Sequence, residues 1–184
     1  VPGDAWPYYT KQPVSLSLDN GWSLVFTESE PAIPGTFTID TLGSWTSLPV
    51  PEASINRGSA TYTITFDLPD IPCDEWILDL GDVRESARVT VNGTAVDTLW
   101  SVPFYTMVKR YLRPGTNRID IEVTNLPANS IAEYDRQGIE WRRFKDANIN
   151  NLGYKKGKYG HWEVIPSGLL GPVHLVPVNL KNQF

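Results

Sequence analysis

Hydrophobic and polar residues alternate along most of this chain with a period of two, the spacing of a β-strand with one buried and one exposed face. In ATYTITFDL, residues 60–68, apolar side chains occupy every second position and threonine or aspartate fills the positions between them. SARVTVNG (86–93) and NRIDIEVTN (117–125) repeat this pattern, and WSLVF, WILDL, FYTMV and VHLVPV are further strand candidates. The pattern predicts about eight to ten strands in an all-β antiparallel sandwich.

Turn residues separate these strands. Asn92-Gly93 suits a tight hairpin, and RPGTN at 113–117 places a proline and a glycine between two strands. Glycines at 81, 93, 168 and 171 are expected to serve the backbone rather than a site. A short helical turn is expected only around IEWRRFKDA, residues 139–147. We predict one sandwich domain over residues 1–184, with residues 1–12 as a linker or an N-terminal extension.

Composition narrows the function classes. The single cysteine, Cys73, cannot form an internal disulfide, and we interpret it as an inert small side chain. No apolar run approaches the ~20 residues of a transmembrane helix, so no membrane partner is expected. No signal peptide is visible, and VPGDAWPYY is interpreted as a trimmed linker or a mature end. A net charge of −5 argues against a nucleic-acid-binding surface.

Four segments carry a family resemblance by their order along the chain. They are GSATYTITFDLP (58–69), LDLGDVRESARVTVNGTAV (78–96), LWSVPFYTMVKRYLRPGTNRIDIEVTNLPAN (99–129) and PSGLLGPVHL (166–175). Together they resemble the galactose-binding-like jelly roll of glycoside hydrolases. The resemblance is to the sugar-binding domain of family 2 enzymes and, still more, to the sandwich near the C-terminus of bacterial α-L-rhamnosidases.

The resemblance implies a non-catalytic, monomeric accessory domain that is covalently linked to the catalytic domain of a bacterial enzyme that degrades plant polysaccharides. It also implies a secreted, periplasmic or cell-surface location. No cofactor is required, but such sandwiches often hold a structural Ca²⁺. Candidate oxygen ligands are Asp19, Asn20, Glu28 and Glu30, whose spacing is not diagnostic.

One long stretch, residues 136–162, has no strand pattern. It holds seven Arg and Lys residues against two carboxylates, a local charge of +5 in an acidic chain. Aromatic rings can stack on the C–H faces of sugars, and Arg, Lys, Asn and His can bond to sugar hydroxyls and carboxylates. The candidate ligand-binding residues are Trp141, Arg142, Arg143, Tyr154, Lys156, Tyr159, His161 and Trp162, with Trp100 as a further candidate in the W-x-x-PF segment.

The basic aromatic stretch is open to three interpretations. Our preferred hypothesis is a glycan-binding loop, with an acidic plant cell-wall polysaccharide such as pectin or glucuronoxylan as the ligand. The second is a structural flap or a contact with the catalytic domain, since interfaces also favour aromatics and arginine. Nucleic-acid binding is the least favoured of the three.

Catalysis by this chain is not expected. Carboxylates occur at 133, 135, 140, 146 and 163, and we interpret them as solvated charges that pair with neighbouring Arg and Lys residues. Ser167 with His161 or His174 lacks the G-x-S-x-G nucleophile motif. His174 is expected on the exposed face of the last strand. The tryptophans at 6, 22, 45 and 76 are expected in the core.

Overall fold

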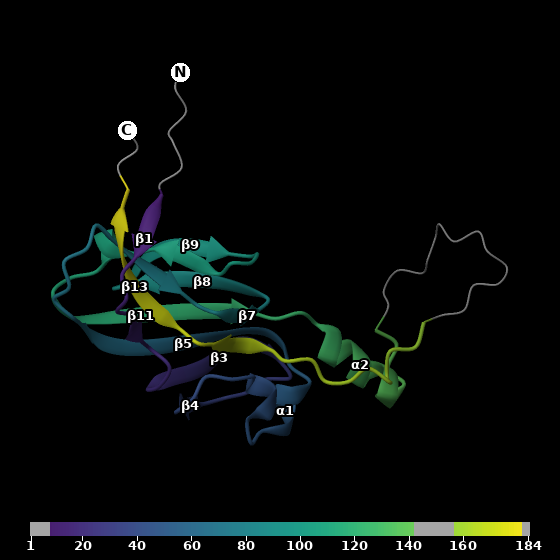
Figure 1. Ribbon diagram of the computed structural model, residues 1–184. Helices are drawn as coiled ribbons and strands as arrows, with labels where there is room; N and C mark the ends of the chain where they lie inside the picture. The colour runs from purple at the N-terminus through teal and green to yellow at the C-terminus, as the bar shows by residue number, and fades with distance from the viewer. Residues whose placement is uncertain (1–7, 142–156, 182–184) are drawn as a thin grey trace.

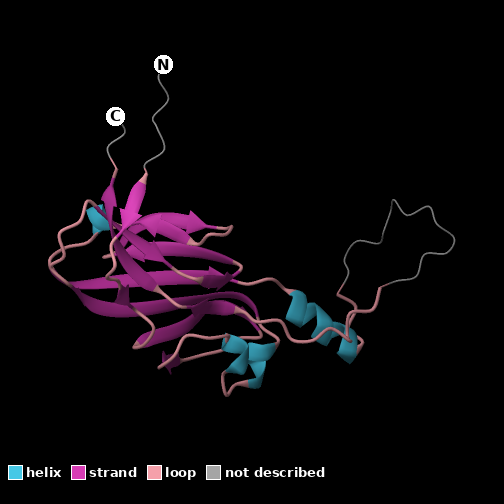
Figure 2. Cartoon of the chain, in the orientation of Figure 1, coloured by secondary structure: helices cyan, strands magenta, loops and turns pink. Residues whose placement is uncertain are grey.

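The computed structural model describes residues 8–141 and 157–181 and shows an all-β sandwich (Figures 1 and 2). Every strand pair in its sheets is antiparallel. The first sheet follows the order β1-β13-β6-β10, and β2 also pairs with β13. Its strands are β1 (Tyr9–Lys11), β2 (Leu16–Ser17), β6 (Glu75–Asp79), β10 (Tyr105–Met107) and β13 (His174–Leu180).

The second sheet follows the order β4-β3-β5-β11-β8-β9. Its strands are β3 (Trp22–Glu30), β4 (Thr36–Ile39), β5 (Arg57–Leu68), β8 (Ser86–Val91), β9 (Thr94–Leu99) and β11 (Gly115–Thr124). A small third sheet pairs β7 (Asp82–Arg84) with β12 (Gly168–Gly171). The remaining regular structure of the described residues consists of short helical segments: η1 (Trp45–Ser47), α1 (Pro51–Ser54), η2 (Lys109–Tyr111) and the longer α2 (Ala128–Gln137).

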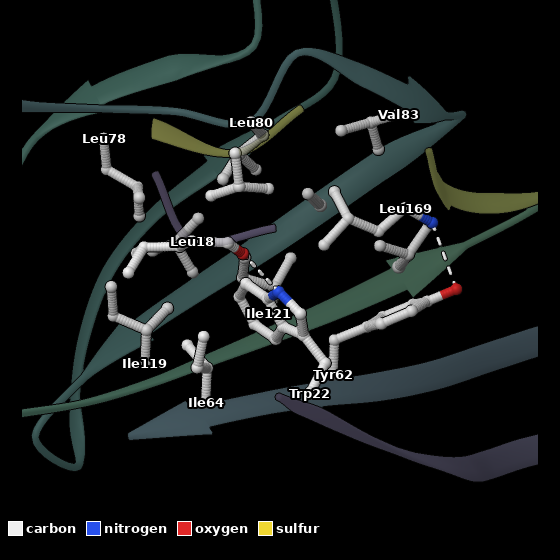
Figure 3. Packing of buried hydrophobic residues seen from close by; sticks show 14 of the residues in the cluster. Leu18, Trp22, Tyr62, Ile64, Leu78, Leu80, Val83, Ile119, Ile121 and Leu169 are labelled. Carbon is white, nitrogen blue, oxygen red and sulfur yellow. Dashed lines mark hydrogen bonds between the residues drawn. The ribbon is translucent and has the colours of Figure 1, made fainter. Parts of the chain in front are cut away.

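The core lies between the two main sheets and contains the residues that the period-two pattern predicted. Ile119, Ile121 and Val123 of β11 are fully buried, and the alternate residues of β5 and β8 face the same interior. Figure 3 shows Trp22 donating from Nε1 to the carbonyl of Leu18 at 2.5 Å within this core. Trp45 and Trp76 are also buried, as predicted, whereas Trp6 lies outside the described residues.

The predicted hairpin turn is confirmed. Asn92 and Gly93 both have positive φ values, 50° and 81°, and they connect β8 to β9. Gly81 and Gly171 also have positive φ, and a Cβ at Gly81 would lie 2.5 Å from the carbonyl carbon of Gly171. Side chains cannot occupy such a close backbone approach, so these glycines serve the fold, as the sequence indicated.

Three features differ from the sequence prediction. The described residues form thirteen strands rather than eight to ten, because they include strands of two to four residues whose periodicity is too short to detect. Residues 9–11, at the end of the segment expected to be a linker or an extension, form β1 and pair with β13. Helix α2, which ends at Gln137, was not expected; of the predicted helical turn, residues 139–141 are not helical and residues 142–147 lie outside the described residues.

Several connections leave the sandwich at one end. Thr124, the last residue of β11, pairs with Ser59 and Ser86, and Leu99, the last residue of β9, pairs with Ala87. The chain segments that follow Thr124 and Leu99 therefore leave the sheet at the same end, on the two sides of β8. Helix α2 follows β11 at this end and projects away from the sheets in Figure 1. The termini of the described chain lie elsewhere, beside β1 and β13.

Candidate functional site

Helix α2 and the returning segment 157–166 form a projection from one end of the sandwich, which we call the arm (Figure 1). The helix ends at Gln137, and the N–H of the next residue, Gly138, donates to the carbonyl of Asp135 at 3.2 Å. Gly138 has a φ of 70°, which directs the following N–H back toward the helix. The next N–H, of Ile139, donates to the carbonyl of Tyr134 at 2.8 Å. This αL glycine ending is common in α-helices, and it turns the chain sharply at the arm's tip.

Side chains of α2 hold the returning segment in place. Asn129 is buried, accepts from the N–H of Ile165 at 2.9 Å and donates to the carbonyl of Ile165 at 2.9 Å. Two turns further on, Arg136 donates to the carbonyls of Gly160 at 2.9 Å and Trp162 at 3.0 Å. The arm therefore has a defined backbone even though the returning segment has no regular secondary structure.

The base of the arm is fastened to the sandwich. Asn125 is buried and donates from Nδ2 to Ser167 Oγ at 3.2 Å, which joins the two chain segments where the arm leaves and re-enters. Tyr134 donates to Glu30 Oε1 at 3.1 Å, and the Arg57 guanidinium lies 5.5 Å from the centre of the Tyr134 ring. Hydrogen bonds from Arg57 and Tyr134 lower the pKa of Glu30 below its ordinary value.

Three of the predicted binding aromatics meet at the tip of the arm. The ring centroids of Trp141 and Tyr159 are 6.0 Å apart, and those of Tyr159 and Trp162 are 4.6 Å apart, with the rings tilted by 46° and 44°. Asp135 accepts a hydrogen bond from Trp141 Nε1 at 2.8 Å and another from the N–H of Tyr159. Tyr159 lies half-buried between its neighbours, whereas Trp162 is 41% exposed and offers an open face.

An open pocket of about 470 Å³ lies beside this aromatic cluster. The carboxylates of Asp135 and Glu140 line it together with the side chains of Lys158 and His161. Ile139 and the glycines at 138, 157 and 160 form the rest of the lining. Its volume falls within the range of roughly 300–1,000 Å³ that is typical of small-molecule sites.

The pocket combines hydrogen-bond donors and acceptors with an adjacent exposed indole. Lys158 and His161 can donate to hydroxyl or carboxylate oxygens, and the carboxylates can accept from hydroxyl groups. A sugar ring has apolar C–H faces edged with such hydroxyls, so it can use an indole and polar groups together. This arrangement can bind a saccharide.

The structure brings together four of the nine predicted site residues at this tip: Trp141, Tyr159, His161 and Trp162. Arg142, Arg143, Tyr154 and Lys156 lie outside the described residues. Trp100 does not line this pocket; it is 78% exposed and lines a different one, with residues of β7.

One charged residue of the pocket has partners that the sequence did not indicate. The carboxylates at 135 and 140 were interpreted as solvated charges paired with Arg and Lys, and Asp135 accepts hydrogen bonds from Trp141 and Tyr159. Glu133 does pair with Arg136, at 2.7 Å, and this hydrogen bond lowers the pKa of Glu133. One feature of the sequence could have indicated the position of Asp135. Glycine often ends a helix, and a helix that ends just before Gly138 has Asp135 in its last turn.

Ser167, His174 and Cys73, which the sequence disfavoured as catalytic residues, lie within the described part of the chain. Ser167 is buried and bonded to Asn125, and His174 is half-buried between Ser17 and Asp79 of the neighbouring strands rather than fully exposed. Cys73 is partly buried, and burial raises the pKa of its thiol, which disfavours the reactive thiolate.

No three His, Cys, Asp or Glu side chains in the described ranges are grouped closely enough to hold a metal ion. Of the candidate Ca²⁺ ligands, Glu30 is paired with Arg57, and Asp19 accepts from Ser17 and from the N–H of Val173. None of the helices described is both long and apolar enough to cross a membrane.

Comparisons with known proteins agree with this architecture. No protein-family profile matches the chain. A protein of Formosa agariphila named "Putative beta-glucuronidase" is 29% identical over 182 residues, which cover 89% of this chain and 16% of that protein. The solved rhamnosidase from Novosphingobium sp. PP1Y matches with a TM-score of 0.70 at 24% identity, over 94% of this chain and 15% of its own.

A solved β-glucuronidase from Faecalibacterium prausnitzii matches with a TM-score of 0.63 at 17% identity, over 92% of this chain and 33% of its own. The chain thus spans no more than a third of the length of these proteins. It is an all-β antiparallel sandwich that resembles part of rhamnosidase and β-glucuronidase chains, as the order of its sequence motifs predicted.

Proposed function

We propose that this chain is an accessory domain of a larger bacterial carbohydrate-active enzyme, and that it binds plant cell-wall polysaccharide through the arm without catalysing a reaction. The observation that carries this proposal is the tip of the arm. There Trp162, which is 41% exposed and directly follows the pocket residue His161 in the chain, lies near a pocket whose polar lining also includes Lys158. A polysaccharide ligand also requires a location outside the cytoplasm, so we extend the proposal to a secreted, periplasmic or cell-surface enzyme.

The similarity to a small fraction of much longer proteins supports a role as one domain among several. Both similar structures are named for the hydrolysis of glycosides, and the relative from Formosa agariphila carries the name of an enzyme that acts on a uronic acid. A carboxylated sugar suits the basic stretch 136–162, because Lys and Arg bond strongly to carboxylates. We therefore propose an acidic glycan as the ligand.

A non-catalytic role is supported by the hydrogen bonding of the pocket carboxylate Asp135. Glycoside hydrolysis uses two carboxyl groups, one that protonates the leaving group and one that attacks the sugar or activates a water. Both oxygens of Asp135 accept hydrogen bonds from within the arm, from Trp141 Nε1 and from the N–H of Tyr159. These bonds give the carboxylate a structural role, which is to hold the aromatic cluster together.

The test is binding of the full 184-residue chain to polygalacturonate, glucuronoxylan and neutral xylan, measured by calorimetry at low and moderate salt. We expect salt-sensitive binding to an acidic glycan and an affinity loss of at least about tenfold in Trp162→Ala, since a stacked ring contributes on the order of 1 kcal/mol or more. Lys158→Ala should weaken binding and reduce its salt dependence.

Tyr8→Ala is the matched control, because Tyr8 is an aromatic residue that is 61% exposed beside β13, away from the arm. It should bind as the unaltered chain does. Equal affinities of Trp162→Ala and the unaltered chain would contradict the arm as the binding site.

A second candidate function is structural: the arm contacts the catalytic domain and braces it. The observation that favours this alternative is a group of exposed apolar side chains on or beside the arm, namely Leu126, Ile139, Val164 and Ile165. Exposed apolar groups are often covered by a partner. Under this alternative the chain would bind none of the three polysaccharides, and replacing Val164 and Ile165 by serine would lower the melting temperature of the parent enzyme.

A further inference from the structure

A second pocket, of about 570 Å³, lies at the same end of the sandwich as the arm and shares no lining residue with the arm pocket. It is formed by β7 and by the loop that connects β9 to β10. The side chains that matter for its chemistry are Asp82, Arg84, Glu85, Trp100, Ser101 and Phe104.

Trp100 is exposed to solvent on a loop whose two ends are anchored in the sandwich. Trp100 is 78% exposed and Val102 is 79% exposed, although the flanking residues Leu99 and Phe104 are buried. The N–H of Leu80 donates to the carbonyl of Phe104 at 2.9 Å, which attaches the end of the loop to the first sheet. The indole is therefore held at a defined place while its surface remains open.

The opposite wall of the pocket carries a rigid polar group. Arg84 donates from Nε to Asp82 Oδ1 at 2.7 Å and from Nη2 to Asp82 Oδ2 at 2.6 Å, and both side chains are close to half exposed. Paired bonds of this kind fix the guanidinium plane, so little side-chain freedom is left to lose on binding. Arg84 Nη1 has no hydrogen-bond partner within the described part of the chain, so a ligand can accept from it without displacing a protein group.

We propose that this second pocket is a sugar-binding subsite, with Trp100 as the stacking platform and the Asp82–Arg84 pair as the group that recognises two neighbouring hydroxyls. A pyranose has an apolar face for the indole and hydroxyls at its edge. The exposed Asp82 oxygens can accept from one hydroxyl, and Arg84 Nη1 can donate to the next. The subsite does not depend on the arm pocket, because it uses none of the arm's residues.

The charge of the lining selects the class of sugar. Two carboxylates, of Asp82 and Glu85, face one guanidinium, which gives the pocket a net charge of −1. The hydrogen bond from Arg84 to Asp82 raises the pKa of Arg84, which keeps the guanidinium positive and paired. An anionic sugar would meet two carboxylates here and, unlike at the arm, no basic stretch such as 136–162 to offset them, so the subsite takes a neutral pyranose.

The experiment follows the indole Nε1–H signals of the seven tryptophans by ¹H–¹⁵N NMR on the full chain. The probes are cellohexaose, xylohexaose and mannohexaose as neutral chains and hexagalacturonate as an acidic one. Trp100→Phe identifies the Trp100 signal by its disappearance. Because Trp100 is so exposed, Trp100→Ala should leave the melting temperature unchanged, so a change in binding reports the site itself.

We expect at least one neutral hexasaccharide to shift the Trp100 signal, with an affinity loss of at least about tenfold in Trp100→Ala. The loss should be smaller in Trp100→Phe, which keeps a ring. Arg84→Lys should also weaken binding, because a lysine keeps the charge but not the planar pair of bonds. Trp162→Ala, in the arm, should bind the neutral probe unchanged, so failure of the arm site and failure of this subsite are distinguishable.

Three results would overturn the subsite: no shift of the Trp100 signal with any neutral probe, a shift with hexagalacturonate alone, or equal affinity of Trp100→Ala and the unaltered chain. With no shift by any probe, the exposed loop is better explained as a contact surface for the remainder of the parent enzyme.

Discussion

The side-chain amide of Asn129 binds both main-chain polar groups of Ile165, at 2.9 Å each, across 36 residues of sequence. A buried asparagine that accepts from an N–H and donates to the carbonyl of the same residue replaces the two bonds of a strand pair. This contact aligns the returning segment with helix α2. The position of the pocket residues Lys158 and His161 depends on that alignment.

Asn129→Ala should release the returning segment. It leaves the N–H and the carbonyl of Ile165 without these partners, which costs about 1–3 kcal/mol for such groups. We expect the amide-exchange protection of Ile165 to fall by roughly tenfold or more, while the core strand β11 keeps its protection. Asn20→Ala, at an exposed turn position, is the control. Unchanged exchange at Ile165 would show that the arm is held by other contacts.

Gly168→Ala should strongly destabilise the sandwich. Gly168 has a φ of 103°, and a Cβ there would lie 2.4 Å from the Tyr62 hydroxyl and 2.8 Å from Trp45 Cε3. Both rings are buried and have no room to move. We expect a loss of at least about 3 kcal/mol in the free energy of unfolding, measured by urea denaturation.

Gly43→Ala is the matched control for this change, because a Cβ at Gly43 would meet no atom within 4 Å. Its free energy of unfolding should stay within about 0.5 kcal/mol of the unaltered chain. Similar losses in the two variants would contradict the crowding at Gly168.

Tyr62 should make the sandwich sensitive to alkali. Its ring is buried, and its hydroxyl accepts from the N–H of Leu169 at 3.2 Å (Figure 3). Burial raises the pKa of Tyr62 well above its ordinary value, because the buried site disfavours the phenolate. The difference between the folded and unfolded pKa of Tyr62 contributes to stability. This contribution is fully present below the pKa of the unfolded state, about 10, and is lost as the pH rises toward the pKa of the folded state.

Urea denaturation near pH 9 and pH 11 tests this dependence. Tyr62→Phe removes the titrating group and the hydrogen bond, so it should cost about 1 kcal/mol at neutral pH and reduce the loss of stability at high pH. If Tyr62→Phe loses as much stability between pH 9 and pH 11 as the unaltered chain does, other residues cause the loss.

Glu133 should make the arm weaker in acid. Hydrogen bonds from Arg136 and Gln137 lower the pKa of Glu133. Because the pKa of Glu133 is lower in the folded state, its ionised form stabilises the arm at pH values above the pKa of the unfolded state, about 4.3. This contribution is lost as the pH falls through the pKa of the folded state. The pair is partly exposed, so its contribution is about 0.3–0.5 kcal/mol.

The amide-exchange protection of Trp162, whose N–H donates to the carbonyl of Tyr159, measures this effect at neutral pH and below pH 4, because Arg136 holds this segment through the carbonyls of Gly160 and Trp162. The protection should decrease in acid for the unaltered chain. Glu133→Gln should show a smaller decrease, and an identical decrease in both proteins would contradict the role of Glu133.

Much of the sandwich could be predicted from local sequence. Val89 and Val91 alternate with polar residues and are fully buried, because alternation places every second side chain on one face of a strand. Asn92 and Gly93 tolerate positive φ, so the hairpin follows from two adjacent residues. Trp22 and Trp45, whose neighbours are strand-like or apolar, were correctly expected inside.

The arm could be predicted only in part. Aromatic residues at 141, 159 and 162 were expected to act together, and the structure does bring them together. Helix α2 was missed, because it has only ten residues, few of them strongly apolar, and bonds to residues far along the chain hold it. Asp135 was assigned as a solvated charge, since nothing local shows that Tyr159 returns to it.

The sequence by itself determined the class of fold, the hairpin and the residues of the core, because alternation and turn chemistry act between neighbours in the chain. Only the tertiary structure decided which distant residues meet: Trp100, expected as a binding residue together with the basic stretch, lines a separate pocket with Asp82 and Arg84. Tyr159 likewise returns to Asp135, 24 residues earlier in the chain. Such pairings depend on packing between segments that are far apart in sequence, and no local pattern records them.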